Sequence, residues 1–200
     1  LVARRGSAAG DRVKRAARLA PVALPEFGMP EEMPQVPAAV YRDRLERLRE
    51  RAAAAGWERL VVYADREHSA SLAYLTGFDP RFEEALLVLG PEGDPALLVG
   101  NECFALAGTA PLGLRRRLFP DFSLPGQPGR GSVSPADLLA AEGIGAGSRV
   151  GVVGWKEYGS PAAMDLPAYL ADALRSLAGP EGVVAAATGL LIGAADGRRV

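Results

Sequence analysis

The amino-acid sequence predicts an α/β domain in which one mixed sheet is flanked by helices. Short apolar runs bounded by glycine, proline or charge alternate with longer segments whose apolar residues follow helical spacing. Two of the runs are joined through Pro91, Gly93 and Asp94, which suits a tight hairpin, whereas the other connections are long enough for crossovers. With 200 residues, the chain can form one ordinary domain with tails.

The first predicted element is an amphipathic helix from Tyr41 to Ala55. Gly56 can end this helix because glycine readily adopts the left-handed conformation. The helix would place on one face the apolar residues Leu45, Leu48, Ala52 and Ala55.

Five apolar runs predict buried strands, since continuous apolar runs are typical of strands covered on both faces. They are Arg59–Tyr63, Ala85–Leu89, Ala96–Val99, Arg149–Val153 and Val183–Ala187.

Two further helices are predicted in the second half of the chain. Ser134, Pro135 and Asp137 supply an N-cap, a first-turn proline and a capping-box acid for a helix that ends near Gly143. The last helix is expected to have Asp165 as its N-cap and Gly179 as its stop. Its apolar face is formed by Leu166, Tyr169, Leu170, Ala173, Leu174 and Leu177.

Residues 1–37 are expected to lie outside the folded domain, which we assign to residues 38–200. Residues 1–18 are rich in arginine with Asp11 as the only acid, and we interpret them as a frayed basic tail. Closely spaced prolines in residues 21–37 favour an extended linker. Because no apolar segment typical of a secretory signal accompanies the arginines, we expect a cytoplasmic protein.

Composition excludes several function classes. The formal net charge of -1 and the pI near 6.0 imply no general affinity for nucleic acid or an anionic membrane. One cysteine, Cys103, and one histidine, His68, exclude disulfide frameworks, Cys/His zinc sites and two-histidine metal sites. The apolar runs are far shorter than the ~20 residues that cross a bilayer. We therefore expect neither a nucleic acid nor a membrane as partner.

Catalytic and nucleotide-binding motifs are incomplete. Gly154 and Gly159 have the spacing of a phosphate-binding loop, but Ser160 and Pro161 follow them in place of the required Lys and Ser/Thr. No G-x-S-x-G nucleophile motif occurs. Cys103 is expected to be a small buried apolar residue without reactivity.

The remaining polar candidates are weak by themselves. His68 could serve as a base for a cysteine or serine, but its polar surroundings are more typical of an exposed or capping residue. Asp79, Glu83 and Glu84 cluster in one loop, where unsupported acids are usually solvated and do not bind a hard cation. We therefore predict no metal site in this chain.

One stretch carries a resemblance to a known family. An apolar strand that ends in Val62-Tyr63 comes first and is followed by Asp65-Arg66-Glu67-His68. The segment Tyr74-Leu75-Thr76-Gly77-Phe78 comes next, and then a second apolar strand. This order resembles the amino-terminal domain of the creatinase, prolidase and Xaa-Pro aminopeptidase family, over residues 34–196. Many members have asparagine three residues before the tyrosine, where this chain has Ser71.

The resemblance implies a ribonuclease-H-like domain without catalytic residues or cofactor. In the family, catalysis belongs to a following pita-bread domain that carries two divalent metal ions. We expect a non-catalytic amino-terminal domain that contributes to oligomer assembly and substrate access. Its partners would be a second copy of the chain or a pita-bread domain with its peptide or small-molecule substrate. The alternative is a stand-alone small-molecule or protein-binding module that shares only the fold.

The resemblance also implies a substrate-proximal loop from Phe78 to Glu84. Its aromatic residues would supply apolar contact, Arg81 could bind a carboxylate, and Glu83 or Glu84 an amine. The alternative is that the aromatic residues anchor the core and the charges face water. The candidate site residues are His68, Phe78, Arg81, Phe82, Glu83 and Glu84.

Overall fold

The computed structural model describes residues 19–26, 28–29, 31–32, 35–129, 131–185 and 191. By its internal contacts the chain divides into two units, residues 1–34 and residues 35–200. The described residues of the first unit form neither helix nor strand, which agrees with the proline spacing there. All helices and strands of the described residues lie in the second unit.

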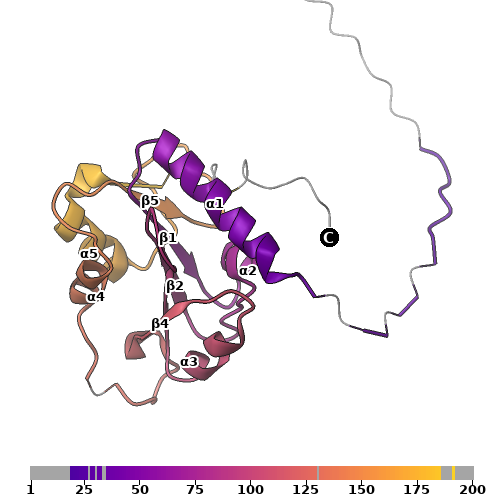
Figure 1. Cartoon of the computed structure of the whole chain (residues 1–200), viewed down its shortest axis with the longest axis horizontal. Helices are drawn as coiled ribbons and strands as arrows, with labels where there is room; N and C mark the ends of the chain where they lie inside the picture. The colour runs from indigo at the N-terminus through magenta and orange to yellow at the C-terminus, as the bar shows by residue number, and fades with distance from the viewer. Residues whose placement is uncertain are drawn as a thin grey trace, which may run out of the picture. The chain divides into compact units, whose positions relative to one another are not determined.

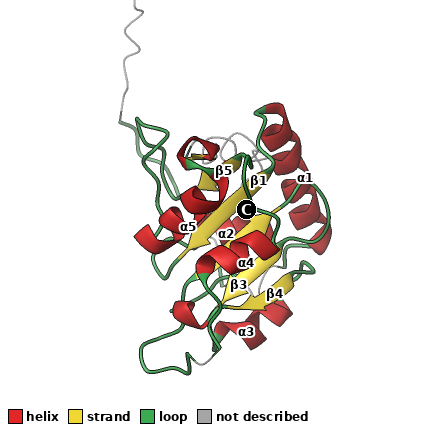
Figure 2. Cartoon of the chain, turned by 90° about the vertical axis from the view of Figure 1, so that its left-hand side faces the viewer, coloured by secondary structure: helices red, strands yellow, loops and turns green. Residues whose placement is uncertain are grey.

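The second unit is built on a six-stranded mixed sheet with strand order β4-β3-β2-β1-β5-β6. Figure 2 shows this sheet with its strands β5, β1, β3 and β4 labelled. The strands are β1 (Arg59–Ala64), β2 (Ala85–Leu89), β3 (Ala96–Val99), β4 (Arg115–Leu118), β5 (Val150–Val153) and β6 (Val183–Val184). β2 runs antiparallel to both β1 and β3, while the pairs β1–β5, β3–β4 and β5–β6 are parallel. The predicted mixed sheet and its hairpin are confirmed.

Helices cover both faces of this sheet (Figure 1). One face carries α1 (Ala38–Ala54), α2 (Ala70–Thr76) and α3 (Cys103–Leu106), and the other carries α4 (Pro135–Ala141) and α5 (Ala168–Ala178). Three short 3-10 helices complete the described elements, η1 (Ala107–Thr109), η2 (Pro120–Phe122) and η3 (Pro180–Gly182).

Successive residues of the central strands enter two different cores. On β1, Leu60 and Val62 pack in the cluster with α1 and α2, whereas Val61 packs in the cluster with α5. On β2, Leu87 joins the first cluster and Leu86 the second. Because both faces are buried, β2 is apolar at every position and β1 is apolar from Leu60 onward, which explains why the sequence showed them as apolar runs.

The structure adds a strand that the sequence analysis missed. β4 is an edge strand whose four residues are all exposed, and three of them are arginines. Arg115 and Arg117 lie 2.6 and 2.9 Å from the carboxylate oxygens of Glu142. Arg116 instead donates to the carbonyl of Phe104 at 3.0 Å. Charged residues are tolerated there because only the edge of a sheet leaves them in solvent.

Helix ends follow the predictions in part. Ser134 caps α4 by accepting the backbone N–H of Asp137 at 3.1 Å, and Gly179 ends α5 with φ +86°. The prediction that Asp165 caps α5 is wrong, because Pro167 occupies the N-cap position. The carboxylate of Asp165 is used by the loop after β5 instead.

Two other segments differ from expectation. α2, which carries the Tyr-Leu-Thr part of the motif, is a helix that was not among the elements predicted from the sequence. β6 ends at Val184, and residues 186–187 of the strand predicted there lie outside the described residues. In the part of the chain that the structure describes, no helix has both the length and the apolar character needed to cross a membrane.

Candidate functional site

The candidate site lies where the parallel strands β1 and β5 end. Val62 is paired with Val153, so the segments that follow the two strands lie side by side at one edge of the sheet. From β1 the chain continues to α2 on one face, and from β5 to α5 on the other. In open α/β sheets, a crevice forms where connections from neighbouring strands leave to opposite faces, and ligands bind in it.

A pocket of about 280 Å³ occupies this edge. It is lined by Tyr63, Asp65, His68, Gly154, Trp155, Asp165, Leu166 and Pro167. The lining combines two carboxylates, an imidazole and apolar side chains, so it has the mixed character of a small-molecule site.

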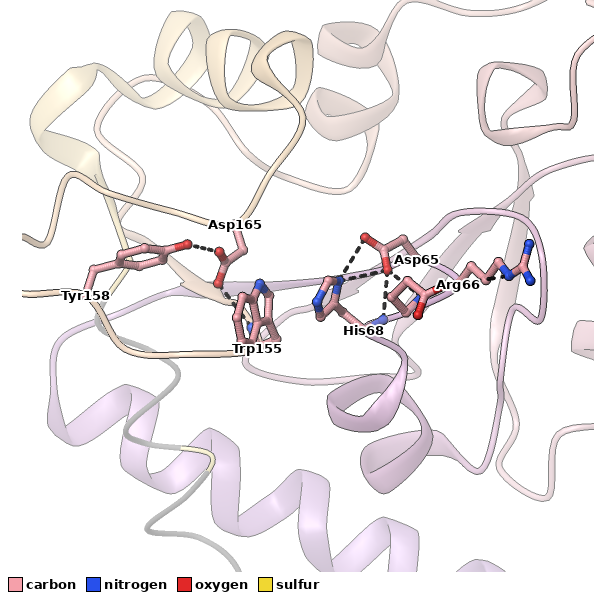
Figure 3. Close-up of polar contacts among 7 residues, drawn as sticks. Asp65, Arg66, His68, Trp155, Tyr158 and Asp165 are labelled. Atoms are coloured by element: carbon pink, nitrogen blue, oxygen red, sulfur yellow. Dashed lines mark hydrogen bonds and ion pairs between the residues drawn. The ribbon is translucent and has the colours of Figure 1, made fainter.

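Asp65 organises the loop after β1 (Figure 3). Its Oδ1 accepts the backbone N–H groups of Glu67 and His68, each at 2.8 Å, and lies 3.0 Å from His68 Nδ1. Burial alone would raise the pKa of Asp65, but the hydrogen bonds from the side chain and backbone of His68 outweigh it and lower that pKa. Asp65 is therefore ionised at neutral pH, and it fixes the orientation of the imidazole.

The imidazole of His68 is also held from the β5 side. Its ring stacks on Trp155, with the centroids 4.7 Å apart and the planes inclined by 22°. Trp155 is 52% exposed. The ammonium of Lys156 lies 4.6 Å from the centroid of Trp155 and 4.8 Å from that of Tyr158. Aromatic rings thus form one wall of the site, and they already contact a cation.

Asp165 fixes the loop that carries Trp155 (Figure 3). Its Oδ2 accepts the backbone N–H of Trp155 at 3.2 Å, and its Oδ1 accepts the hydroxyl of Tyr158. A Cβ at Gly154 would lie only 2.2 Å from Asp165 Oδ2. The carboxylate therefore packs directly against the backbone of Gly154, and glycine at this position makes that approach possible.

Another carboxylate, that of Glu84, adjoins the pocket through Tyr63. The side chains of Tyr63 and Tyr169 hydrogen-bond to Glu84, whose Oε2 is buried without a partner among the described residues. Burial raises the pKa of Glu84 despite these two hydrogen bonds. Burial and the neighbouring Glu84 also raise the pKa values of Tyr63 and Tyr169.

The structure separates the candidate residues of the loop from Phe78 to Glu84. Phe78 is 3% exposed in the core beneath α1, which matches the alternative that it is an anchor. Glu83 is buried and accepts the backbone N–H of Cys103 at 2.8 Å, so its carboxylate serves the start of α3. Arg81, with φ +61°, and Phe82 are exposed.

Of the six candidates, His68 lines the pocket and Glu84 contacts it through Tyr63. A substrate-proximal role for Arg81 and Phe82 stays a prediction. Tyr63, Trp155 and Asp165 also line the pocket but were not among the residues predicted from the sequence. The first two follow or end a predicted strand, so the rule that ligands bind at the carboxyl ends of strands could have found them.

Cys103 has the buried position that its sequence context predicted. It is 1% exposed, and its thiol lies 3.0 Å from the carbonyl oxygen of Pro80. Burial, with the nearby carboxylate of Glu83, raises the pKa of Cys103 to about 12. Among the described residues, no group of three or more His, Cys, Asp or Glu side chains could hold a metal ion.

Comparisons with known proteins find similarity among solved structures. No family model matches the chain, and no curated protein matches it. The dipeptidase PepE of Mycobacterium ulcerans is 22% identical with a TM-score of 0.50, over 80% of this chain and 38% of that one. An Xaa-Pro aminopeptidase of Streptococcus pyogenes is 19% identical with a TM-score of 0.45, over 72% of this chain and 88% of that one.

A third structure is the creatinase/prolidase N-terminal domain of an X-Pro dipeptidase from Streptococcus pyogenes. It is 17% identical with a TM-score of 0.43, over 68% of this chain and 87% of that one. The likeness to the mycobacterial dipeptidase confirms the expected fold. This chain spans little more than a third of that dipeptidase.

Proposed function

We propose that this chain is the non-catalytic amino-terminal domain of an Xaa-Pro peptidase or creatinase-like metallohydrolase. Its roles would be to assemble the oligomer and to shape access to the substrate of a separate metal-binding domain. The observation that carries the proposal is the fold shared with a dipeptidase of which this chain covers 38%. The metal pair of that chemistry does not fit the described residues, so its ligands would belong to the other domain.

Exposed residues of the loop before β2, whose first residue pairs with the last residue of β1, support a role in substrate access. Phe82 is 46% exposed, and the neighbouring Arg81 is exposed on a turn that Asp79 stabilises by accepting the Arg81 N–H at 2.8 Å. An aromatic ring beside a guanidinium can contact the apolar and carboxylate parts of a peptide.

Exposed apolar residues on α3 and on the edge strand β4 support assembly. Leu106 of α3 is 40% exposed and Leu118 of β4 is 44% exposed. Apolar side chains on neighbouring elements favour contact with another protein surface.

The test begins with the reading frame after the codon for Val200. The proposal expects it to continue into a segment with a histidine and paired acids. The longer chain should release the first residue of an Xaa-Pro peptide when manganese is added, whereas residues 1–200 should not. Replacing Arg81 and Phe82 with alanine in the longer chain should raise KM.

Two results would contradict this proposal. One is a reading frame without metal-ligating residues. The other is metal-dependent turnover by residues 1–200 that a chelator abolishes and that persists through further purification.

The pocket favours the second candidate function, a stand-alone module that binds a small molecule. Its polar and aromatic groups converge within this chain alone. Saturable ligand binding by residues 1–200, together with a reading frame that stops, would favour the module over the peptidase domain.

A further inference from the structure

We propose that the pocket at the ends of β1 and β5 binds a small organic ammonium ion, a primary amine on an apolar body. This inference concerns residues 1–200 alone and does not depend on the peptidase proposal. It follows from the charge of the pocket, its aromatic wall and its size.

The charge of the lining favours a cation. Asp65 and Asp165 contribute two carboxylates, and none of the lining residues that the structure describes is a lysine or arginine, although the ammonium of Lys156 contacts the ring of Trp155. Among the described residues, Oδ2 of Asp165 accepts the backbone N–H of Trp155, and its Oδ1 accepts the hydroxyl of Tyr158. A carboxylate can accept about four hydrogen bonds, so Asp165 retains capacity for a donor from a ligand. An anionic ligand would face like charges at close range.

The aromatic wall favours an ammonium on organic carbon. Trp155 is 52% exposed, and its ring accepts the ammonium of Lys156 at 4.6 Å from the ring centroid. Because Lys156 is an exposed, flexible side chain, a ligand ammonium would take its place over the ring while Lys156 turns into solvent. Leu166 and Pro167 add apolar lining. A ligand with a cationic head and an apolar body matches both parts of the pocket.

The size restricts the ligand to a small molecule. A volume of about 280 Å³ is at the lower end of ligand pockets, which start at roughly 300 Å³. One ring with a short amine arm fits this range, whereas a larger peptide would have to extend into solvent.

The test uses the only histidine of the chain as its reporter. Because His68 lies in the pocket lining, its imidazole Cε1–H resonance in a proton NMR spectrum reports on the site without assignment work. The folded chain is titrated with benzylamine, with the neutral analogue benzyl alcohol and with the anion benzoate. We expect a saturable shift with benzylamine and at least tenfold weaker binding of the other two.

Two variants then test whether benzylamine binding depends on the carboxylate of Asp165. Asp165→Asn keeps an oxygen acceptor but removes the charge, and it should weaken benzylamine binding at least fivefold. Glu157→Gln is the matched control, because Glu157 is an exposed acid of the same loop that lies outside this pocket. The Glu157→Gln variant should bind benzylamine as tightly as the unmodified chain does.

A further arm distinguishes a free amine from a peptide amino terminus. Glycyl-prolinamide carries an α-ammonium, which N-acetylglycyl-prolinamide lacks. Binding of the first alone would identify peptide amino termini as a source of the ligand, and binding of benzylamine alone would identify free amines.

Three results would overturn the inference. They are no shift of the His68 resonance with either amine, equal binding of benzyl alcohol and benzylamine, and equal loss in the Asp165→Asn and Glu157→Gln variants. The comparison of the three benzyl compounds needs no variant, so it decides the question even if Asp165→Asn fails to fold.

Discussion

The imidazole of His68 stacks on the indole of Trp155, at 4.7 Å between ring centroids. These residues follow β1 and β5, which are adjacent in the sheet although they are far apart in the sequence. Asp65 holds His68 from one side, and Asp165 holds the backbone of Trp155 from the other. The stack therefore joins two loops that each depend on their own carboxylate.

The first prediction concerns the strength of this stack. His68→Ala should lower the free energy of unfolding by about 1 kcal/mol, because it removes a ring contact and the hydrogen bond to Asp65. His68→Phe keeps a ring against Trp155 and should therefore lose less free energy of unfolding. Urea unfolding measures the loss for both variants, and equal losses would show that the stack contributes nothing to stability.

The second prediction concerns the close approach at Gly154. Gly154→Ala would place a Cβ 2.2 Å from Asp165 Oδ2, so the carboxylate must move and release the N–H of Trp155. We expect a loss of about 1–3 kcal/mol in unfolding free energy and a change in the tryptophan fluorescence, to which Trp155 contributes together with Trp57. Gly159→Ala is the control, because a Cβ there meets nothing within 4 Å. Similar effects of the two substitutions would contradict the close packing.

The sequence predicted the centre of the fold better than its edges. β2 and β3 have the predicted bounds, because burial on both faces makes every residue apolar. β4 was missed because an edge strand pairs through its backbone while its arginines stay in solvent. Asp165 was assigned to the wrong role because its local spacing from α5 fits a cap, and only the fold brings it to Trp155.

The candidate site was predictable only in part for the same reason. His68 belongs to a motif visible in the sequence, but Trp155 and Asp165 reach it through the pairing of β1 with β5. Strand order is a tertiary property that the periodicity of single segments does not encode. Phe78 and Glu83 illustrate the converse, since residues near a motif can serve the core or a helix end.

The third prediction uses the ion pairs of Glu142. Burial alone would raise its pKa, but hydrogen bonds and charge from Arg115 and Arg117 outweigh it and lower that pKa. A carboxylate with a lowered folded-state pKa stabilises the fold above its unfolded-state pKa of about 4.3, and this contribution is lost as pH falls through the folded value. Glu142→Gln should cost about 1–3 kcal/mol at pH 7.

The pH series distinguishes this effect from a general loss of packing. The cost of Glu142→Gln should shrink as the pH falls from 6 to 3, as measured by urea unfolding at each pH. Arg116→Ala is the control, because Arg116 contacts Phe104 and not Glu142, and its effect should be constant over this range. A cost of Glu142→Gln that does not vary with pH would contradict the assignment.

The fourth prediction has the opposite sign and concerns Glu84. Burial raises its pKa, against the hydrogen bonds from Tyr63 and Tyr169. Between the unfolded and the raised folded pKa, the folded chain binds more protons than the unfolded one, so stability falls as pH rises through this window.

The glutamine of the Glu84→Gln variant cannot ionise, so this variant does not lose stability as the pH rises through the window. The variant should therefore gain stability relative to the unmodified chain as the pH rises from 3 to 7, in the same urea series. Its difference from the unmodified chain must change in the direction opposite to that of Glu142→Gln. A parallel change in the two variants would mean that the ionised form of Glu84 is favoured by its surroundings, and that Tyr63 and Tyr169 stabilise a charge at the edge of the pocket.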